Sequence, residues 1–503
     1  MSAILRADDL NDFIMPGVAC IKPVESGKKG SGEDLEIQID SEGNALEVTK
    51  EGHERKLDKA QISLSDCLAC SGCITSAEEV LIAQHSHKEL LNALETDGNR
   101  KVFVASISHQ TRASLASAFD VQIEAMDKVL IYLLKNVMKF KYVIGTETGR
   151  RLSHIFTTLD LQNRSPHSEK PLINSTCPGW VLYAEKTHPF ILPRISTIKS
   201  TQQITGHLLK NIVSKDLGIE KSQIYHLSVM PCFDKKLEAA RDSDVPDVDC
   251  VITARELVQV IEELNIDLQT ILKESVLDNT DIYSVYRSSS PPGWYQPEQS
   301  WLNNKGSASG GYAMQYLLDV QQRHADSEII TIEGRNSDIY EHRLVLRDGQ
   351  VVASSAVVNG FRNIQNLIRK LKPNHKATGG GISARRRSRK LKEDQTGDQG
   401  QSNAVVDPSK CDYVEIMACP GGCINGGGQI AAPADQNSKD WINKATTKYY
   451  NVPDTEYSDI QLYDWVKQTV LSYDIEMDRL IHTTFKQIER PTDTTSIALG
   501  STW

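Results

Sequence analysis

The 503-residue sequence has no apolar run of the roughly eighteen residues that a transmembrane helix needs. Its N-terminus, MSAILRADDLND, has neither a basic leader nor an apolar core, and it is too acidic for an organellar transit peptide. There is no excess of basic residues either. The net charge of -10 and the pI near 5.8 argue against a nucleic-acid binder that works by bulk electrostatics. We expect a globular cytoplasmic protein, with the nucleus as a second location, whose partners are metals, small molecules or proteins.

Two catalytic signatures are also missing. The segment GTETGRR at Gly145 to Arg151 follows an apolar run but lacks the GK[ST] of a phosphate loop. No serine or cysteine nucleophile constellation stands out. In a reducing compartment, ten cysteines are expected to bind metal or react rather than to form disulfides.

Eight of the ten cysteines fall into two groups of four, and each group contains a close-set motif. The motifs are CLACSGC at Cys67 to Cys73 and CPGGC at Cys419 to Cys423. A cubane iron-sulfur cluster needs four thiolates, and two-residue gaps let one tight loop supply several of them while its amides point at the sulfurs. The spacing therefore predicts two cluster sites.

The second group is predicted from the ends of apolar runs that read as strands. In an open α/β sheet, sites are assembled where strands end at their carboxyl edge. These positions are Cys177 after Leu172 to Ser175, Cys232 after Ile224 to Met230, and Cys419 after the run that ends near Met417. Cys423 comes from the same loop as Cys419, and the nearby glycines let backbone approach a bulky cluster. We predict a four-cysteine cluster buried between two lobes.

The first group has three cysteines in CLACSGC, Cys67, Cys70 and Cys73, and needs a remote fourth ligand. Cys20 is our choice, because it lies in the same small N-terminal unit after a Pro-Gly turn. We interpret the two remaining cysteines, Cys250 and Cys411, as structural or incidental thiols.

The texture of the sequence predicts two regions. Residues 1-98 are short, polar and broken, with a hairpin over Leu35 to Ile39 and Ala45 to Thr49. Residues 99-503 alternate apolar runs with helical patterns, which favours an α/β domain with parallel sheets covered on both faces. We expect further strands at Val102 to Ile107, Tyr142 to Gly145, Val248 to Thr253, His342 to Leu346, Val351 to Val358 and Tyr413 to Met417, with helices at Ala125 to Phe140, Ala254 to Leu264 and Phe361 to Leu371.

A polar segment at 374-407 interrupts this second region. It has no apolar periodicity and reads as a disordered insertion. Its basic run, Arg385 to Lys390, could be a nuclear address, but the acids that follow favour a solvated patch.

Zinc is the alternative metal on pattern alone, because structural zinc sites also use closely spaced cysteines. Such sites usually take two close pairs. Here one group is a triple plus one remote cysteine, and the other draws on three strand ends. The pattern therefore favours iron-sulfur clusters.

Three longer motifs carry a family resemblance. NSTCPGW at Asn174 to Trp180, MPCFDKKLEA at Met230 to Ala239 and EIMACPGGCINGGGQ at Glu415 to Gln429 resemble the three active-site segments of iron-only hydrogenases, in the same order. Within that superfamily the chain is most similar to the nuclear architecture related proteins, the hydrogenase-like cytosolic iron-sulfur assembly factors. The resemblance implies a two-lobed hydrogenase-like fold plus a small N-terminal iron-sulfur domain.

The resemblance also implies two [4Fe-4S] clusters. The first would lie on Cys20, Cys67, Cys70 and Cys73, and the second on Cys177, Cys232, Cys419 and Cys423.

One departure from the hydrogenases bears on activity. The residue before the first ligand cysteine is, in those enzymes, a second cysteine that passes protons to a diiron subsite, and here it is Thr176. A hydroxyl has a pKa far above that of a thiol and is a poor proton relay at neutral pH. Lys235 and Cys423 do match the lysine and the bridging cysteine of the diiron pocket. We predict a non-catalytic protein. The alternative is a hydrogenase-type redox enzyme, and the third hypothesis is an interaction module stabilised by structural zinc.

The last residue, Trp503, suggests a partner. Assembly factors and their clients resemble one another in ending on an aromatic residue that docks on the targeting complex, and a ring with a terminal carboxylate forms a compact recognition unit. We expect contact with that complex, through its WD40-repeat subunit, and with an upstream cluster scaffold, but with neither nucleic acid nor membrane.

Overall fold

The computed structural model describes two compact units, Met1–Ala69 and Cys70–Trp503. The described residues are 82, 84–98, 100–165, 168–241, 246–277, 279–373, 406–433, 435–456, 458–473 and 475–488, together with the backbone of 36–39, 45–48 and 54–56. In the first unit, β1 (Glu36–Ile39), β2 (Ala45–Val48) and β3 (Glu54–Lys56) form an antiparallel sheet. The predicted hairpin is confirmed, and β3 adds a strand that the sequence did not reveal.

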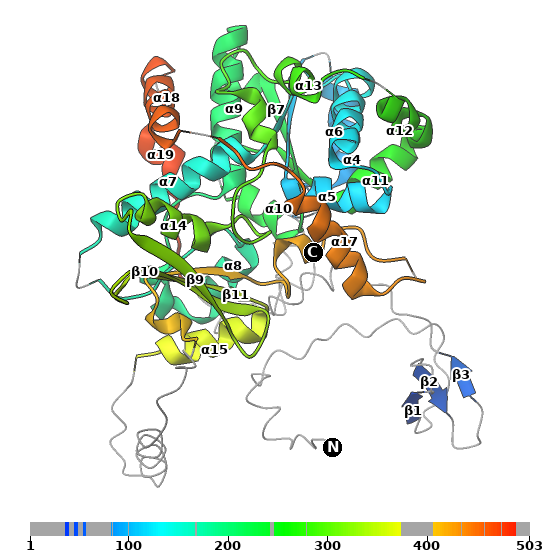
Figure 1. Cartoon of the computed structure of the whole chain (residues 1–503). Helices are drawn as coiled ribbons and strands as arrows, with labels where there is room; N and C mark the ends of the chain where they lie inside the picture. The colour runs from blue at the N-terminus through cyan, green and yellow to red at the C-terminus, as the bar shows by residue number, and fades with distance from the viewer. Residues whose placement is uncertain are drawn as a thin grey trace, which may run out of the picture. The chain divides into compact units, whose positions relative to one another are not determined.

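The second unit contains two sheets, and Figure 1 shows the helices that surround them. One sheet has four parallel strands in the order β5-β4-β7-β8. Their bounds are β4 (Val102–Ile107), β5 (Tyr142–Gly145), β7 (Ile224–Met230) and β8 (Cys250–Thr253). Three of these strands have the predicted bounds, and β8 begins two residues later than predicted.

The other sheet has five strands in the order β6-β12-β11-β10-β9. They are β6 (Leu172–Ile173), β9 (Ser327–Glu333), β10 (Ile339–Leu346), β11 (Val351–Asn359) and β12 (Tyr413–Met417). The sheet is parallel from β6 to β11, but β10 and β9 extend it in the antiparallel sense. These two strands pair antiparallel because short turns join β9 to β10 and β10 to β11. The Asp348-Gly349 pair, a sequence typical of hairpin turns, lies between β10 and β11, and Gly349 has a φ of 86°.

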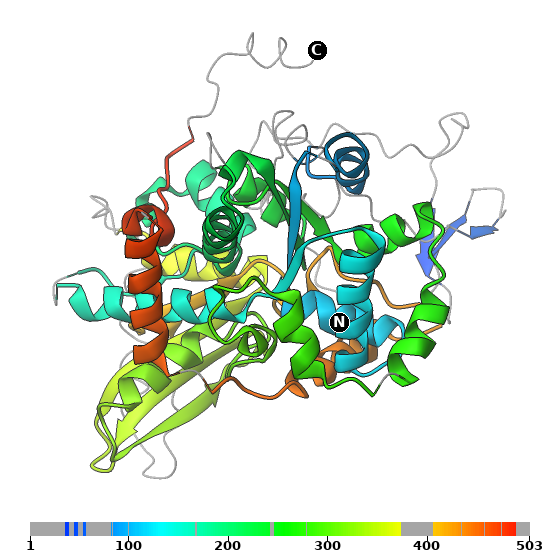
Figure 2. The ribbon, with the colours of Figure 1, turned by 90° about the horizontal axis from the view of Figure 1, so that it is seen from above.

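Helices cover both sheets. Their bounds are α4 (His87–Asp97), α5 (His109–Ala118), α6 (Ile123–Tyr132), α7 (Glu147–Asn163), α8 (Pro178–Thr187), α9 (Thr201–Leu217), α10 (Asp234–Ala239), α11 (Ala254–Glu263), α12 (Leu268–Leu277), α13 (Ile282–Ser289), α14 (Tyr312–Gln321), α15 (Phe361–Leu371), α17 (Ser438–Tyr450), α18 (Asp459–Ser472) and α19 (Met477–Ile481). Short 3-10 turns lie at Pro189–Arg194, Lys221–Gln223, Pro297–Trp301, Pro408–Lys410 and Cys423–Asn425, and a π-helical turn at Leu133–Val137. Figure 2 shows α18, in red, crossing α7 at one side of the unit.

The four-stranded sheet separates two hydrophobic cores. Along β4, Phe103, Ala105 and Ile107 pack into one core with α5, α6 and α11, whereas Val104 packs into the other with α7 and α9. Successive side chains of a strand point to opposite faces, so an all-apolar run is what a sheet covered on both sides requires. This explains why the uninterrupted apolar runs predicted these strands well.

The predicted helix at Phe361 to Leu371 is confirmed as α15, and α11 matches its prediction to within one residue. The helix predicted at Ala125 to Phe140 is shorter. It passes into the π-helical turn and ends at Met138, because Lys139 adopts a left-handed backbone with a φ of 64°. No helix among the described residues is long and apolar enough to cross a membrane.

The predicted domain boundary at residue 98 stays a prediction, because residues 57–81 lie outside the described part of the chain. Helix α4 lies before this boundary and packs against α11 and β8, with Leu90 in the core. The predicted insertion at 374-407 lies outside the described residues as far as residue 405. At its end, the Asp407 carboxylate accepts a hydrogen bond from Lys370.

Candidate iron-sulfur site

The second predicted cysteine group lies at the carboxyl ends of strands from both sheets. Cys177 and Cys419 follow β6 and β12, which are neighbours in the five-stranded sheet. Cys232 follows β7 of the four-stranded sheet, and Cys423 begins the 3-10 turn that closes the CPGGC loop. The sequence argument placed these thiols at one sheet edge, but the structure assembles them from the edges of two.

The glycine-rich loop after β12 reaches across to the four-stranded sheet. The Gly428 amide donates to the Pro231 carbonyl at 3.0 Å, directly beside Cys232. A Cβ atom at Gly426 would lie 2.4 Å from the same carbonyl oxygen, so any side chain there would push the loop away. Because of this contact, the end of the loop is held against the strand end that carries Cys232.

The four sulfurs lie close enough to act on one another electrostatically. Burial raises the pKa of Cys232 well above its ordinary value, the Asp234 carboxylate adds to the rise, and so do the sulfurs of Cys419, Cys423 and Cys177. Burial likewise raises the pKa of Cys423 to about 12, with a further contribution from Cys177. Negative charge on several of these sulfurs is therefore costly unless something positive binds between them.

Local structure favours a thiolate at Cys177 even though burial raises its pKa. Cys177 is the residue before α8, with Pro178 at the first helical position, so its sulfur lies near the positive end of the helix dipole. The Ala418 amide, from the end of β12, donates to the Cys177 sulfur at 3.3 Å. An amide directed at a ligand sulfur is the arrangement that iron-sulfur sites use.

The donor set fits a cluster with four cysteine ligands. One buried and three half-buried cysteines converge from three backbone segments, an amide is directed at one sulfur, and glycine backbone lines the loop. Among the described residues, no group of three or more His, Cys, Asp and Glu side chains has the geometry to hold a single metal ion.

Thr176 is tied into the backbone of the five-stranded sheet. The side-chain nitrogen of Asn174 donates to the Thr176 hydroxyl oxygen at 2.7 Å, and the side-chain oxygen Oδ1 of Asn174 accepts from the Ile416 amide at 3.0 Å. The hydroxyl at this position is thus fixed by a neighbour two residues away and, through it, by β12.

The charge of Lys235 is balanced by a carboxylate on the same helix, α10. Its ammonium donates to both carboxylate oxygens of Glu238 at 2.9 Å. Burial alone would lower the pKa of Lys235, but the Glu238 carboxylate outweighs it and the pKa is raised. Glu238 also accepts from Ser200 and Gln202, so the charged pair belongs to a larger hydrogen-bond network.

Several predicted residues cannot be placed. Cys20, Cys67, Cys70, Cys73 and Trp503 lie outside the described residues, as does the basic run. The two cysteines predicted to be structural are buried away from this group. Burial raises the pKa of each to about 12, and their sulfurs face the backbone oxygens of Ser86 and Asp407, respectively.

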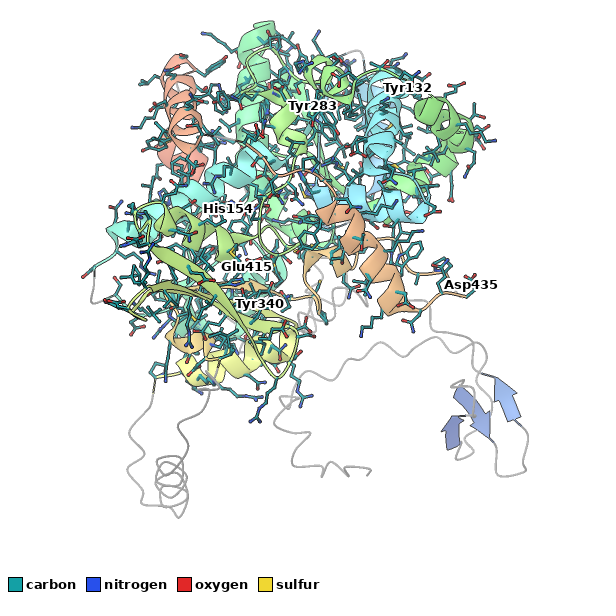
Figure 3. The ribbon with its side chains drawn as sticks, viewed as in Figure 1. Tyr132, His154, Tyr283, Tyr340, Glu415 and Asp435 are labelled. Carbon is teal, nitrogen blue, oxygen red and sulfur yellow. The ribbon has the colours of Figure 1, made fainter. Side chains whose placement is uncertain are left out.

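The sequence reasoning missed a set of residues behind the cysteine loop, namely Ser307, Ser309 and Glu415. Glu415 is fully buried on β12, and in the view of Figure 3 it is labelled between His154 and Tyr340. The Ser309 hydroxyl accepts a hydrogen bond from the Cys423 amide at 2.9 Å. The only sequence signal was the SASGG composition of 307–311, which indicates a turn but not what the turn contacts.

The fold and the cysteine group together define an iron-only-hydrogenase-like protein. Residues 101–427 match the family model described as the iron only hydrogenase large subunit, C-terminal domain. An apo [FeFe]-hydrogenase HydA1 variant from Chlamydomonas reinhardtii is similar in structure, with a TM-score of 0.56 and 21% identity, over 80% of this chain and 99% of that one. At this level of identity the likeness concerns the fold alone.

Full-length relatives narrow the class. The chain is 48% identical to the cytosolic Fe-S cluster assembly factor NAR1 of Debaryomyces hansenii and 49% identical to the protein of the same name from Meyerozyma guilliermondii, with 100% of each chain covered. The chain therefore belongs to the family of hydrogenase-like cytosolic Fe-S cluster assembly factors.

Proposed function

We propose that this protein is a non-catalytic iron-sulfur protein that binds two [4Fe-4S] clusters and acts in cytosolic and nuclear iron-sulfur protein assembly. It would relay clusters from an upstream scaffold to the targeting complex. The observation that carries the proposal is the convergence of Cys177, Cys232, Cys419 and Cys423 in a chain whose full-length relatives are named as assembly factors. The first cluster rests on Cys20, Cys67, Cys70 and Cys73 and on the spacing of CLACSGC.

The cost of gathering four thiols supports a resident cluster at the second site. Mutual repulsion and burial disfavour thiolates there, and iron bound between the sulfurs would supply the compensating positive charge. The protein's own contribution is to preset three backbone segments, to direct the Ala418 amide at one sulfur and to bring glycine backbone close. Such a cluster supplies one-electron chemistry when bound, and four cysteine ligands favour its retention.

Two contacts argue against hydrogen turnover. Thr176 offers a hydroxyl in place of a thiol, and Asn174 already donates to it. The Lys235 ammonium is paired with both oxygens of Glu238, which competes with any other anion for that charge. A hydrogenase-type redox enzyme with a diiron subsite on Lys235 and Cys423 is the second candidate, and the hydrogenase-like fold is the observation that favours it.

Trp503 would carry the contact with the targeting complex, through its WD40-repeat subunit. Deletion of Trp503 should weaken co-purification with that complex while leaving the iron content unchanged. Loss of iron in this variant would contradict a role confined to partner binding.

Anaerobic purification with iron, sulfide and zinc analysis tests the cluster assignment. Two cubanes predict about eight iron and eight sulfide per chain. Cys177→Ala and Cys20→Ala should each lose about half of the iron if the two groups are independent. Cys411→Ala is the matched control, because its buried thiol faces the backbone oxygen of Asp407, and it should keep the full iron content.

Infrared spectroscopy separates the two candidates. An assembly factor should show no carbon monoxide or cyanide bands, whereas a diiron subsite requires them. Stoichiometric zinc without sulfide would exclude both candidates.

A further inference from the structure

A turn that was not recognised in the sequence, Ser307 to Ala313, is fastened to the strand that leads into the cysteine loop. The Ser307 hydroxyl donates to one carboxylate oxygen of Glu415, and the Ala313 amide donates to the other at 2.8 Å. The Ser307 oxygen also accepts from the amides of Ser309 and Gly311 at 3.2 and 3.3 Å. The turn is therefore fixed relative to β12, which precedes Cys419 in the chain.

Ser309 reaches from this turn to the far side of the loop. Its hydroxyl oxygen accepts from the Cys423 amide at 2.9 Å, and the residue is 8% exposed. Because the oxygen is the acceptor, the hydroxyl hydrogen remains free to donate. Ser309 also lies within hydrogen-bonding range of the Cys423 side chain, so its hydroxyl can donate to the sulfur.

The glycine before Cys423 makes this approach possible. Gly422 has a φ of 81°, and a Cβ there would lie 2.2 Å from the Ser309 oxygen. Any other residue at this position would be strained and would displace the serine. The cysteine loop and the turn therefore fit together where Gly422 meets Ser309.

We propose that Ser309 is a positioning residue of the second cluster, which fixes Cys423 through its amide and raises the reduction potential by donating a hydrogen bond to the Cys423 sulfur. This inference rests on the proposed function. A donor to a ligand sulfur stabilises the more negative, reduced state of a cluster, so its loss should make reduction harder.

The test compares Ser309→Ala, Ser309→Thr and Ser289→Ala in the full-length, cluster-loaded protein. Ser289 is the matched control, because its buried hydroxyl donates to the Tyr286 carbonyl on α13. Redox titration followed by EPR should show a more negative potential for the second cluster in Ser309→Ala. That variant should also lose iron faster to a chelator. Ser309→Thr keeps the hydroxyl and should restore both values, and Ser289→Ala should leave both unchanged.

A second measurement detects the Ser309 hydroxyl proton directly. In D₂O, pulsed ENDOR should detect an exchangeable proton coupled to the cluster in the parent protein and lose it in Ser309→Ala. An unchanged potential together with an unchanged exchangeable proton in Ser309→Ala would overturn the inference. A shift in Ser309→Ala that Ser309→Thr does not restore, with the proton coupling retained in both, would overturn it in favour of simple packing.

Failure of the inference differs from failure of the proposed function. If Cys177→Ala leaves the iron content unchanged, then there is no second cluster and the proposed function fails at that site. If the cluster is present and insensitive to Ser309, then only the role of Ser309 is wrong.

Discussion

The two sheets of the second unit contribute to the cysteine group unequally. The four-stranded sheet is parallel throughout and supplies only Cys232, whereas the five-stranded sheet and its loop supply the other three cysteines. The four-stranded sheet is buried on both faces, and every residue of its strand β7 is buried. The second ends in β9, where Ile330 is exposed. A sheet covered on both faces thus provides one cysteine, and a sheet with an open edge provides the loop that carries two of the others.

The largest difference in stability is expected when one partner of a charged pair is substituted on each side. On the four-stranded side, Arg112 donates to both oxygens of Asp127 at 2.7 and 2.5 Å, and neither side chain is exposed. Asp127→Asn leaves a buried guanidinium without its counter-charge and should lower the free energy of unfolding by about 3 to 5 kcal/mol. Urea denaturation of the full chain at fixed cluster loading measures this.

The matched control for that prediction is Asp407→Asn on the five-stranded side. Its partner is Lys370 at 3.0 Å, and the Lys370 side chain is 56% exposed, so we expect a loss of at most about 1 kcal/mol. Equal losses in the two variants would break the contrast between the two regions.

Acid sensitivity should come mainly from the four-stranded side. Asp247 lies just before β8. Burial alone would raise its pKa, but the hydrogen bond and charge of His207, together with Lys199, lower it to about 2. A depressed folded-state pKa gives stability that is present above the unfolded pKa of about 4 and is lost as the pH falls towards 2, worth about 2 kcal/mol.

Asp247→Asn should therefore flatten the dependence of unfolding free energy on pH between about 4 and 2. Asp326→Asn is the control, because this carboxylate is exposed beside Arg347 at the edge of the five-stranded sheet. A slope that persists in Asp247→Asn would place the acid-sensitive group elsewhere.

The smallest expected effects come from removing one methyl group from an isoleucine in each of the two sheets. Ile252 on β8 is fully buried, so Ile252→Val should cost about 0.5 to 1.5 kcal/mol. Ile330 on β9 is 40% exposed, and Ile330→Val should change stability by less than about 0.5 kcal/mol. Thermal or urea unfolding of the two variants side by side measures the difference, and a larger loss at Ile330 would mean that the edge of β9 is covered.

Much of this fold could be predicted because its strands are buried on both faces. Val102–Ile107, Tyr142–Gly145 and Ile224–Met230 are short apolar runs with clear ends, and all three have the predicted bounds. β9 was not predicted, because its side chains are mostly half-buried or exposed and it lies at an edge. Its place depends on pairing with β10 rather than on its own pattern.

The positions of Cys177, Cys232 and Cys419 could be predicted for the same reason, since each follows a recognisable strand. What could not be predicted is which sheet each strand joins. β6 has only Leu172 and Ile173, and these pair with Tyr413 and Val414 of a strand far along the chain. The role of Ser309 was equally hidden, because a serine in a turn has no sequence signal for the backbone amide that it meets in three dimensions.

The strand order has a consequence for the timing of synthesis. β12 inserts between β6 and β11, which both precede it in the chain, and Cys419 and Cys423 follow it. During translation, the segments that carry Cys177 and Cys232 leave the ribosome long before Cys419 and Cys423 have been synthesised. Until then the group of four cysteines is incomplete. At about 5 to 20 residues per second, the four cysteines come together only once most of the chain has been made. Loading of the second site would then be a late, post-translational step, and iron content would report completed folding.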